Sequence, residues 1–593
     1  MILYSFYGMS QQEDFKRKIK PGYGIARFLL ERGVKHVFGI PDGHTLGFYD
    51  GILQNDGIDH ILLNDERSAA FAADAYARVT GMLGVCDAGA AGSMNFPVAL
   101  TEADGFGSPV LVIVGIIKSN EVLKNIPHDI NVEGTLSAIT KWTGKVLNAE
   151  YLPRFLEYGL KQAINGRPGP AALIISEDVF RFQEVRLDHF IPRTGGGSCS
   201  INSCRTSPAQ EEIEQAVEMI RKASQPAFFA GAGAIRSRAF SEITELSRML
   251  HAPVFSTISG KGIMLEDDEF YFGTVGLFGE KPNHKFIRKQ ADLLIVVGNR
   301  LTEDDTANFK VPVSTRSTDM IQIDIDPAEI GLSYRPWGVV GDPKAALQGI
   351  ITLLKQQGIT KNSNLQKVME ERKQNVEQLK NKLNQYRQKD RERWINADPI
   401  KPQRVLKAIS DNLTERDYLV TDASSSARWI GAYYPVKSIG RKIITPRGVG
   451  PTGFGVGALI GTCIAADTYY LDSNQPPPKK VLFTGDGGLV NGGITEFETI
   501  NKLGLDCTII IINNRSLGFV KFGQAMLYKK RYFQTDRPNT DFAKITEAFG
   551  GNGFRVEKLN ELDSKIQKAI NSNGFNLVDV KIDPWELLPP NSY

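Results

Sequence analysis

The stretches Lys479–Gly488 (KKVLFTGDGG) and Cys507–Asn514 (CTIIIINN) decide the fold, because each is an apolar run that ends in polar residues. Runs of this length and composition are typical of buried strands. Parallel strands bring their carboxyl ends to the same edge of a sheet, where ligands bind. The two stretches therefore predict a parallel sheet that carries Asp486 and Asn514 at one edge.

The oxygen atoms expected at this edge suit a magnesium ion. Asp486 offers an anionic oxygen and Asn514 a neutral one, and Mg²⁺ takes such ligands together with phosphate oxygens. Gly487 and Gly488 would let backbone N–H groups approach those phosphates. The Gly-Asp-Gly-Gly turn or the Asn-Asn turn alone would be an ordinary turn after a strand. The two together, with 25 residues between Gly487 and Asn513, are hard to obtain by chance.

This pair of motifs resembles the GDG…NN motif of thiamine diphosphate (ThDP) enzymes. The resemblance implies a ThDP cofactor bound together with Mg²⁺. It implies that the metal ligands are Asp486, Asn514 and the backbone carbonyl of Ser516. The glycines expected to contact the cofactor are Gly485, Gly487 and Gly488.

A second match lies in Asn64–Arg78 (NDERSAAFAADAYAR), which is similar to the HEQxAAxxAxGYAR segment of these enzymes. Glu66 takes the position of the family's carboxylate. The resemblance implies that Glu66 hydrogen-bonds the aminopyrimidine ring and favours its imino tautomer, so that the cofactor removes its own C2 proton. Without the resemblance, a glutamate in a first helical turn is only a favourable partner of the helix dipole.

A third match lies in Arg447–Gly455 (RGVGPTGFG), where the family has its GxGxMG segment. The resemblance implies that the carbonyl of Gly450 accepts from the aminopyrimidine amine and that Thr452 props the cofactor. Thr452 is smaller and more polar than the usual residue. Acetolactate synthases have Gly-Gln-His beside the diphosphate, and here Ser424, Ser425 and Ser426 offer three hydroxyls instead.

The resemblance spans nearly the whole chain and is closest to acetolactate synthase. Together with alternating strand and helix patterns, it predicts an α/β protein with three doubly wound parallel-sheet domains. The predicted units are a pyrimidine-binding domain (1–192), a central domain (208–355), a charged helical connector (356–397) and a diphosphate-binding domain (398–593). The connector is expected to be a solvated helix, and Arg193–Pro208 a Gly- and Ser-rich linker.

Several positions depart from the acetolactate synthase pattern near the expected substrate. Gly523 stands where the synthases have a tryptophan, which predicts a wider acceptor pocket. Phe519 and Ile116 are further positions expected to face substrate. His44 and His128 also fall at substrate-facing positions, where either could protonate a carbanion or orient a carboxylate, although a lone histidine is more often structural.

Composition narrows the class of protein. The net charge of +3, from 70 basic and 67 acidic residues, does not favour a partner that is a nucleic acid or a membrane surface. No stretch reaches the ~18 apolar residues of a membrane span, and the pattern at the start of the chain does not predict a secretory signal. Five cysteines in 593 residues indicate a reducing, cytoplasmic location. Cys199 and Cys204 lack a second pair, so we expect two loop thiols rather than a zinc site.

The expected reaction is ThDP- and Mg²⁺-dependent decarboxylation of a pyruvate-like 2-oxo acid, followed by carboligation to an acceptor carbonyl. The departures at Gly523, His44 and His128 keep open a C–C bond lyase or hydrolase, or a simple 2-oxo-acid decarboxylase. A catalytically silent regulatory homologue is a remote alternative, because Glu66 and Asp486 are both present.

The resemblance has two further implications for cofactors and partners. Gly298–Asp305 departs from the segment that helps hold FAD in the synthases, so FAD is compatible with the sequence but not implied. The small-molecule partner would be a 2-oxo acid or a diketone. The chain is expected to form a homodimer or homotetramer whose active sites combine Glu66 of one subunit with Asp486 of the other.

Overall fold

The structure is a computed structural model that describes residues 16–190, 205–311, 318–359, 361, 364–470 and 475–586. Cys199, Cys204 and most of the predicted linker lie outside these residues. Within the described ranges, none of the helices combines the length and the apolar character that a membrane span needs.

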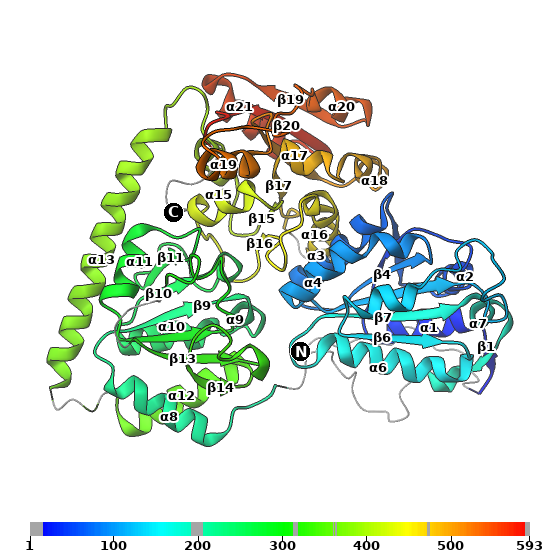
Figure 1. The fold of residues 1–593 in the computed structure, drawn as a ribbon, viewed down its shortest axis with the longest axis horizontal. Helices are drawn as coiled ribbons and strands as arrows, with labels where there is room; N and C mark the ends of the chain where they lie inside the picture. Colours follow the sequence, from blue (N-terminus) through cyan, green and yellow to red (C-terminus); the bar gives the residue numbers. More distant parts are fainter. Residues whose placement is uncertain are drawn as a thin grey trace. The chain divides into compact units, whose positions relative to one another are not determined.

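Three six-stranded sheets form the framework, and every strand pair within them is parallel (Figure 1). The first sheet has the order β3 (Asp59–Leu62), β2 (His36–Gly39), β4 (Gly84–Gly89), β5 (Val110–Ile116), β7 (Pro170–Ser176) and β6 (Trp142–Val146). The second has the order β11 (Tyr271–Thr274), β10 (Val254–Ser256), β9 (Pro226–Ala230), β12 (Leu293–Val297), β13 (Asp319–Asp324) and β14 (Trp337–Val340). The third has the order β16 (Ile443–Ile444), β15 (Tyr418–Thr421), β17 (Lys480–Gly485), β18 (Cys507–Asn513), β20 (Phe575–Lys581) and β19 (Asn552–Val556). The predicted α/β class with three parallel sheets is confirmed.

Helices follow most of these strands, as parallel connections require. With the first sheet are α1 (Pro21–Glu31), α2 (Leu46–Leu53), α3 (Glu66–Thr80), α4 (Pro97–Phe106), α5 (Val132–Ser137), α6 (Leu152–Ile164) and α7 (Glu177–Phe182). With the second are α8 (Gln210–Lys222), α9 (Ala232–Arg236), α10 (Phe240–Leu250), α11 (Lys281–Lys289) and α12 (Pro343–Gln357). After α13 (Leu365–Trp394), the third sheet has α14 (Pro402–Asn412), α15 (Ser425–Tyr433), α16 (Phe454–Tyr470), α17 (Asp486–Val490), α18 (Phe497–Lys502), α19 (Gly518–Leu527), α20 (Phe542–Ala548) and α21 (Leu559–Asn571).

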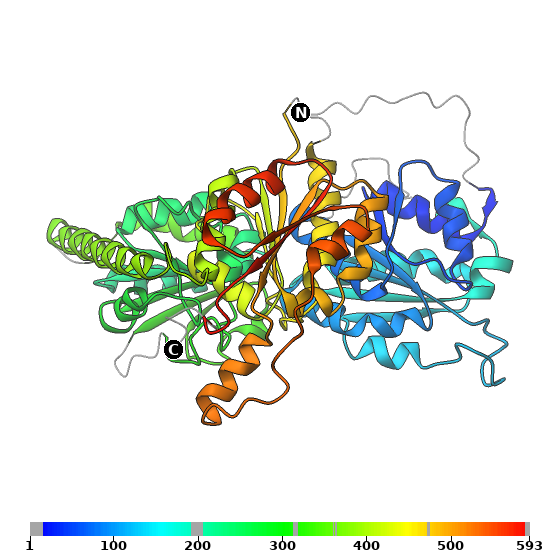
Figure 2. The same ribbon diagram turned by 90° about the horizontal axis from the view of Figure 1, so that it is seen from above.

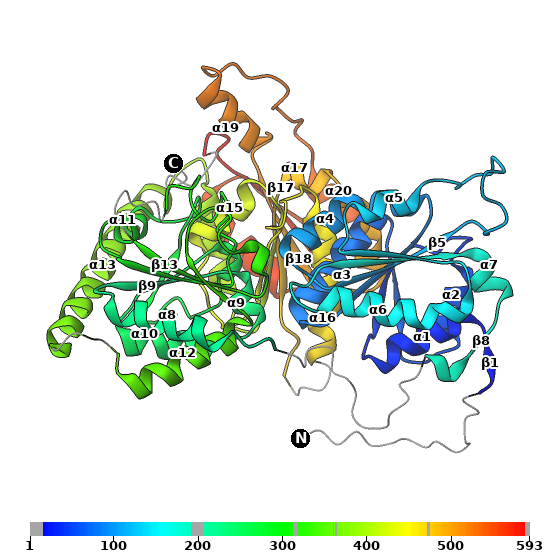
Figure 3. The same cartoon turned by 60° about the horizontal axis from the view of Figure 1, so that its bottom comes forward.

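The chain packs as two compact units. The first consists of the described residues of Met1–Ala73, Leu83–Leu100 and Ser108–Ser203, and it contains the first sheet, which Figure 3 shows nearly edge-on with helices on both sides. The second holds the other two sheets together with Asp74–Met82 and Thr101–Gly107. The ends of α3 and α4 are therefore counted with the second unit, although their sequence lies in the predicted first domain.

Small residues let α3 lie close to its sheet. Six of its alanines are buried, namely Ala69, Ala70, Ala72, Ala73, Ala75 and Ala77. A Cβ atom at Gly84, the first residue of β4, would lie only 2.1 Å from the carbonyl oxygen of Ala73. The close approach explains why this helix is rich in alanine.

The predicted connector is helical, but it is not solvated all round. α13 buries Val376, Leu379 and Leu383 on one side. Arg372 is also fully buried and donates to the backbone carbonyls of Ser224, Leu250 and Ala223. These are carbonyls of the central domain, and its apolar core includes the three apolar residues. The expectation of a solvated helix is wrong for this side, because the apolar residues recur too sparsely among charges to mark a buried face.

In the third sheet, α17 begins directly after β17 and α16 is apolar over nearly all of its length. α19 projects away from the rest of the second unit in the two rotated views (Figures 2 and 3). The strands β15, β17 and β18 are neighbours, so their carboxyl ends lie side by side at one edge. The predicted metal ligands and the three predicted serines follow these three strand ends.

Candidate active site

A cavity of about 580 Å³ lies at the carboxyl edge of the third sheet. It is formed by the segments that follow β15, β17 and β18, together with the segment before α16. The predicted residues that line it are Ser424, Ser425, Ser426, Gly450, Thr452, Gly485, Asp486, Gly487, Gly488, Asn514, Ser516 and Phe519. Residues from four separate stretches of sequence are thus brought to one cavity by the parallel topology.

Asp486, the aspartate of the GDG motif, lines the cavity and is 3% exposed. Burial raises the pKa of Asp486 to about 6, although the nearby Arg537 lowers it. The Nε atom of Arg537 lies 3.7 Å from the carboxylate, too far for a hydrogen bond. A buried carboxylate with such weak compensation is a favourable ligand for a cation.

The other two predicted metal ligands also line the cavity. The Asn514 side-chain oxygen accepts from the Ser516 backbone N–H at 3.0 Å, which fixes the turn after β18. The Ser516 hydroxyl donates to the Thr535 carbonyl at 3.0 Å, which holds the side chain, and the predicted ligand is the backbone carbonyl. A carboxylate, an amide oxygen and a carbonyl form a hard, all-oxygen donor set, and it fits Mg²⁺.

The three glycines around Asp486 differ in how much space a side chain would find at each position. A Cβ atom at Gly488 would lie 2.8 Å from the Asp422 carboxylate, so this position has no room for a side chain. At Gly485 a Cβ atom would meet nothing within 4 Å, and at Gly487 only the side chain of Leu517 at 3.4 Å. Close internal packing explains Gly488, whereas the other two leave open backbone at the cavity.

Asp422 is a buried residue of the site that the sequence did not single out. It accepts from the backbone N–H groups of Gly453 at 3.0 Å and Gly455 at 3.2 Å. Burial raises the pKa of Asp422 to about 6, and the hydrogen bonds from Ala423 and the glycine-rich segment oppose that rise. Its position at the end of the apolar run YLVTD is the signal that could have drawn attention to it.

The three serines after β15 are not equivalent. Ser426 is buried, and its hydroxyl donates to the carbonyls of Asp422 and Ala423 at 2.9 and 2.7 Å. The expectation that all three hydroxyls are available to a diphosphate is therefore wrong for Ser426. Ser424 is exposed, has a left-handed backbone with φ of 66°, and begins the turn into α15. Ser424 and Ser425 keep accessible hydroxyls at the cavity.

In the first unit, Glu66 is the first residue of α3 and lies at the carboxyl edge of the first sheet. One of its carboxylate oxygens accepts from the Asn95 side-chain amide at 2.9 Å. A Cβ atom at Gly92 would lie 2.2 Å from the other oxygen, so only glycine leaves room for the carboxylate there. The segment after β4 thus positions Glu66, and Asn95 and Gly92 were not foreseen.

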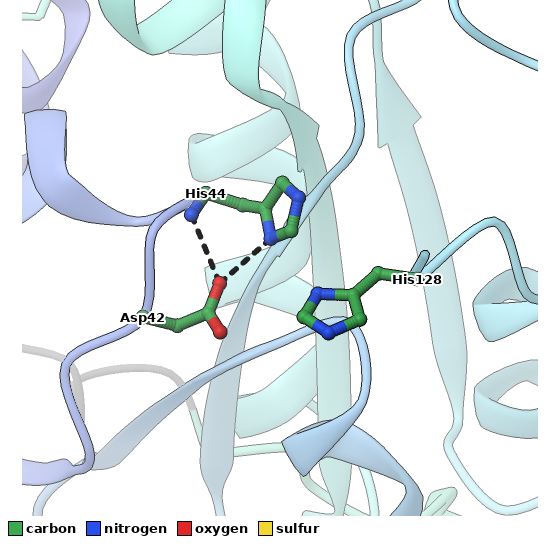
Figure 4. A group of neighbouring side chains, drawn as sticks. All are labelled: Asp42, His44 and His128. Carbon is green, nitrogen blue, oxygen red and sulfur yellow. Dashed lines mark hydrogen bonds and ion pairs between the residues drawn. The ribbon is translucent and has the colours of Figure 1, made fainter. Parts of the chain in front are cut away.

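The two histidines come together at the same edge of the first sheet (Figure 4). Their ring centroids are 5.1 Å apart. The Nδ1 atom of His44 lies 2.7 Å from a carboxylate oxygen of Asp42, which also accepts from the His44 backbone N–H at 2.9 Å. This contact assigns the Nδ1–H tautomer to His44 and leaves its Nε2 as an acceptor. Gly89 provides the space, because a Cβ atom there would lie 2.0 Å from the Asp42 carboxyl carbon.

Asp42, His44 and His128 each offer a ligand atom, and these three atoms all lie within 4.8 Å of one another. The spacing is compatible with a three-ligand metal site. The contact between Asp42 and His44 accounts for their arrangement without a metal. Ile116, which ends β5, is 9% exposed and offers little surface to a substrate.

Gly523 does not line the cavity, whereas Phe519 and part of the FAD-related segment do. Among the described residues that line the cavity, Phe519 is included and Gly523 is not. A Cβ atom at Gly523 on α19 would meet nothing within 4 Å. Glu303 and Asp304, from the segment that departs from the FAD pattern, do line the cavity, and Asp304 forms an ion pair with Arg447.

Comparison with known proteins gives three matches to family models that follow the order of the sheets. Residues 20–134 match the N-terminal TPP binding domain of thiamine pyrophosphate enzymes, 213–350 the central domain, and 422–580 the C-terminal TPP binding domain. Thiamine pyrophosphate is another name for ThDP.

Full-length relatives are also similar. The chain is 30% identical to a probable acetolactate synthase large subunit of Methanocaldococcus jannaschii, over 96% of this chain and 93% of the relative. It is 28% identical to the acetolactate synthase large subunit of Haemophilus influenzae, over 97% and 96% respectively. It is 28% identical to the large subunit of acetolactate synthase isozyme 2 of Escherichia coli, over 96% and 97%. The chain therefore belongs to the thiamine pyrophosphate enzyme family, in the group that contains the acetolactate synthase large subunits.

Proposed function

We propose that this protein is a ThDP-dependent decarboxylating carboligase of the acetolactate synthase kind. It removes CO₂ from a pyruvate-like 2-oxo acid and joins the remaining fragment to an acceptor carbonyl. The observation that carries this proposal is the cavity at the carboxyl edge of the third sheet, which is lined by residues of both the GDG and the NN motif. The relatives of similar length are named as acetolactate synthases, and this supports the same reaction.

ThDP, when bound, supplies the electron sink that stabilises the carbanion left by loss of CO₂. The protein's own part is to hold and orient that cofactor. Asp486, Asn514 and the Ser516 carbonyl would bind Mg²⁺, and the open backbone at Gly485 and Gly487 would admit the diphosphate. The family match supports ThDP, and the donor set supports the metal.

Glu66 would hold the aminopyrimidine ring through a hydrogen bond, and Asn95 keeps its carboxylate oriented. His44 would accept or return a proton at its Nε2 atom, because Asp42 holds the proton on the other ring nitrogen. His128 lies beside it and would orient a substrate carboxylate or share the same proton. Neither histidine needs FAD for this role, and FAD is not part of the proposal.

The proposed assembly is a homodimer or homotetramer with shared active sites. Glu66 and Asp486 lie in different compact units of the chain, and they are expected to act on opposite ends of one cofactor. A shared site would pair the first unit of one subunit with the second unit of its neighbour. A cytoplasmic location stays a prediction from the cysteine usage.

The test is a product survey. Purified protein is incubated with ThDP, Mg²⁺ and single or paired 2-oxo acids, and in parallel with 1,2-diketones, and the products are identified by mass spectrometry. The expected product has the summed mass of two 2-oxo acids less one CO₂. An aldehyde as the sole product would instead establish a simple decarboxylase, and cleavage of a diketone would establish a lyase or hydrolase. Protein that binds ThDP but yields no product from any of these substrates would contradict the proposal.

A further inference from the structure

Three successive backbone N–H groups of the segment before α16 converge on one buried carboxylate. Glu102, on α4, accepts from Gly448 at 2.8 Å, from Val449 at 2.8 Å and from Gly450 at 3.0 Å. Its side chain is fully buried. Consecutive N–H groups that point to one centre form an anion-binding concavity. Here the anion that fills it belongs to the protein itself.

A buried arginine compensates the charge of this carboxylate. The Nη2 atom of Arg78, on α3, donates to Glu102 at 2.9 Å, and Arg78 also pairs with Asp74 through two hydrogen bonds. Burial by itself lowers the pKa of Arg78, but Asp74 and Glu102 together raise it above its ordinary value, so the guanidinium stays charged. Arg78 further donates to the Thr445 carbonyl at 2.8 Å. The segment is thus held at Thr445 by the cation and at Gly448–Gly450 by the anion.

Close packing leaves this segment little freedom. A Cβ atom at Gly448 would lie 2.1 Å from the Glu102 carbonyl oxygen, and one at Gly105 would lie 2.7 Å from the Gly448 carbonyl carbon. Beyond Gly450, which has a left-handed φ of 73°, the hydrogen bonds to Asp422 hold Gly453 and Gly455. Two buried carboxylates therefore fix the backbone on both sides of Thr452. The planar peptide groups carry this constraint to the carbonyls of Arg447, Gly448 and Val449. The Gly450 carbonyl follows directly after them, between the stretch held by Glu102 and the stretch held by Asp422.

We propose that Glu102 is a positioning residue for ThDP. Its carboxylate sets the backbone of Gly448–Gly450 before the cofactor arrives, so that the Gly450 carbonyl is already placed to accept a hydrogen bond from the aminopyrimidine. Arg78 holds the Glu102 carboxylate in place through its hydrogen bond. Preorganisation of this kind raises affinity because the cofactor does not have to order the segment itself. The inference rests on the proposed function, since it concerns the same cofactor.

The first test compares the affinity for ThDP of two buried-carboxylate variants. Glu102→Gln keeps the size of the side chain but loses the charge and turns an amide towards donors. We expect a dissociation constant for ThDP, measured by calorimetry at saturating Mg²⁺, that is at least ~10-fold higher than for the wild type, because hydrogen bonds to a charged acceptor are lost. At saturating ThDP, kcat should fall by less than the affinity. Glu280→Gln is the matched control, since Glu280 is also buried and pairs with an arginine, Arg387, but makes no contact with this segment.

A merely structural role for Glu102 gives a different pattern. The thermal transition would then fall in both variants, while the affinity for ThDP in folded Glu102→Gln stayed at the wild-type value or dropped no more than in Glu280→Gln. Either result would overturn the proposal. Failure of the wild type to bind ThDP at all would instead contradict the proposed function, and this inference would fall with it.

A measurement on the wild type keeps the proposal testable if Glu102→Gln does not fold. Amide hydrogen exchange of the segment 446–451 is followed by mass spectrometry in the cofactor-free protein and after addition of ThDP and Mg²⁺. We expect slow exchange at Gly448–Gly450 already without cofactor, because Glu102 engages these N–H groups. Fast exchange that becomes slow only when ThDP binds would show that the cofactor orders the segment, and the inference would be wrong.

Discussion

The Nε atom of Arg537 lies 3.7 Å from the carboxylate of Asp486, inside the site that is proposed to hold a divalent cation. Arg537 has a quarter of its side chain exposed, so the guanidinium has room to turn away. A metal ion at Asp486 would therefore compete with Arg537 for this carboxylate.

The first prediction concerns the pH dependence of cofactor binding. Burial raises the pKa of Asp486 to about 6, and Arg537 works against that rise. Protons compete with the metal, so the affinity for ThDP with Mg²⁺ should weaken as the pH falls through about 6, up to ~10-fold per unit. Arg537→Gln removes the cation that lowers the pKa of Asp486, so the weakening should begin at a higher pH. The diphosphate's own titration is common to both proteins, and the calorimetric binding curves can therefore be compared directly. Identical pH profiles for the wild type and Arg537→Gln would contradict the prediction. They would mean either that Asp486 does not bind the metal or that Arg537 does not influence the pKa of Asp486.

The second prediction concerns Glu66→Gln. Asn95 can still donate to the new side chain, so the fold and most of the affinity for ThDP should be retained. An amide cannot favour the imino tautomer, and turnover should fall by at least ~10², the scale of an acid–base effect. The matched control is Glu177→Gln, a glutamate at the start of α7 in the same unit. Near-normal turnover in Glu66→Gln would refute the proposed role.

The third prediction tests shared active sites by complementation. Glu66→Gln and Asp486→Ala are each expected to be inactive, the second because it loses an anionic metal ligand and cannot bind ThDP at micromolar concentration. A mixed dimer would hold one doubly altered site and one unaltered site, so activity should return to a fraction of the wild-type value. Native mass spectrometry checks that the subunits exchange. Exchange without any recovery would mean that the two residues act within one chain.

The fourth prediction concerns the two histidines. His44→Gln should lower kcat by ~10² or more and leave the affinity for ThDP unchanged. Asp42→Asn should lower kcat by less, because an amide no longer enforces the Nδ1–H tautomer of His44 but leaves the imidazole in place. His189→Gln is the control, since that histidine lies beside Asp188 on another segment of the first unit. If Asp42→Asn and His189→Gln have the same kcat and pH profile, Asp42 has no positioning role.

The fifth prediction concerns Gly523→Trp. The position is open, since a Cβ atom there would meet nothing within 4 Å, so the variant should fold. If α19 faces the acceptor in the working enzyme, the indole should shift preference towards small acceptors such as a second pyruvate. A change of one or two methylenes in a pocket is worth ~1–3 kcal/mol per group. Competition between paired acceptors measures this preference. Unchanged product ratios in a folded, ThDP-bound variant would exclude Gly523 from acceptor selection. That outcome would agree with the position of Gly523 outside the residues that line the cavity.

The sequence alone determined the α/β class and the edge of the sheet where the predicted metal ligands lie, because these depend on local order along the chain. Asp486 and Asn514 directly follow apolar strands, and parallel strands must bring such residues to one edge. Glu66 was predicted from the resemblance of Asn64–Arg78 to a segment of ThDP enzymes, because its place in a first helical turn indicates no more than a partner of the helix dipole. The family matches and the three parallel sheets bear out the family and the α/β class. The roles of Asp486, Asn514 and Glu66 stay predictions.

Only the tertiary structure decided which polar side chains are occupied by the protein itself and which remain for a ligand. Glu102 and Gly448 are 346 residues apart, and an isolated glutamate in a helix has no local pattern that predicts burial beneath a distant segment. The same holds for Arg372 on α13 and for the Ser426 hydroxyl, which was expected at the diphosphate but donates to its own turn. Burial and hydrogen-bond partnership are properties of the packed chain, because a buried polar group must find its partners wherever the fold brings them. The sequence thus located the site, and the packing decided which residues hold its backbone in place.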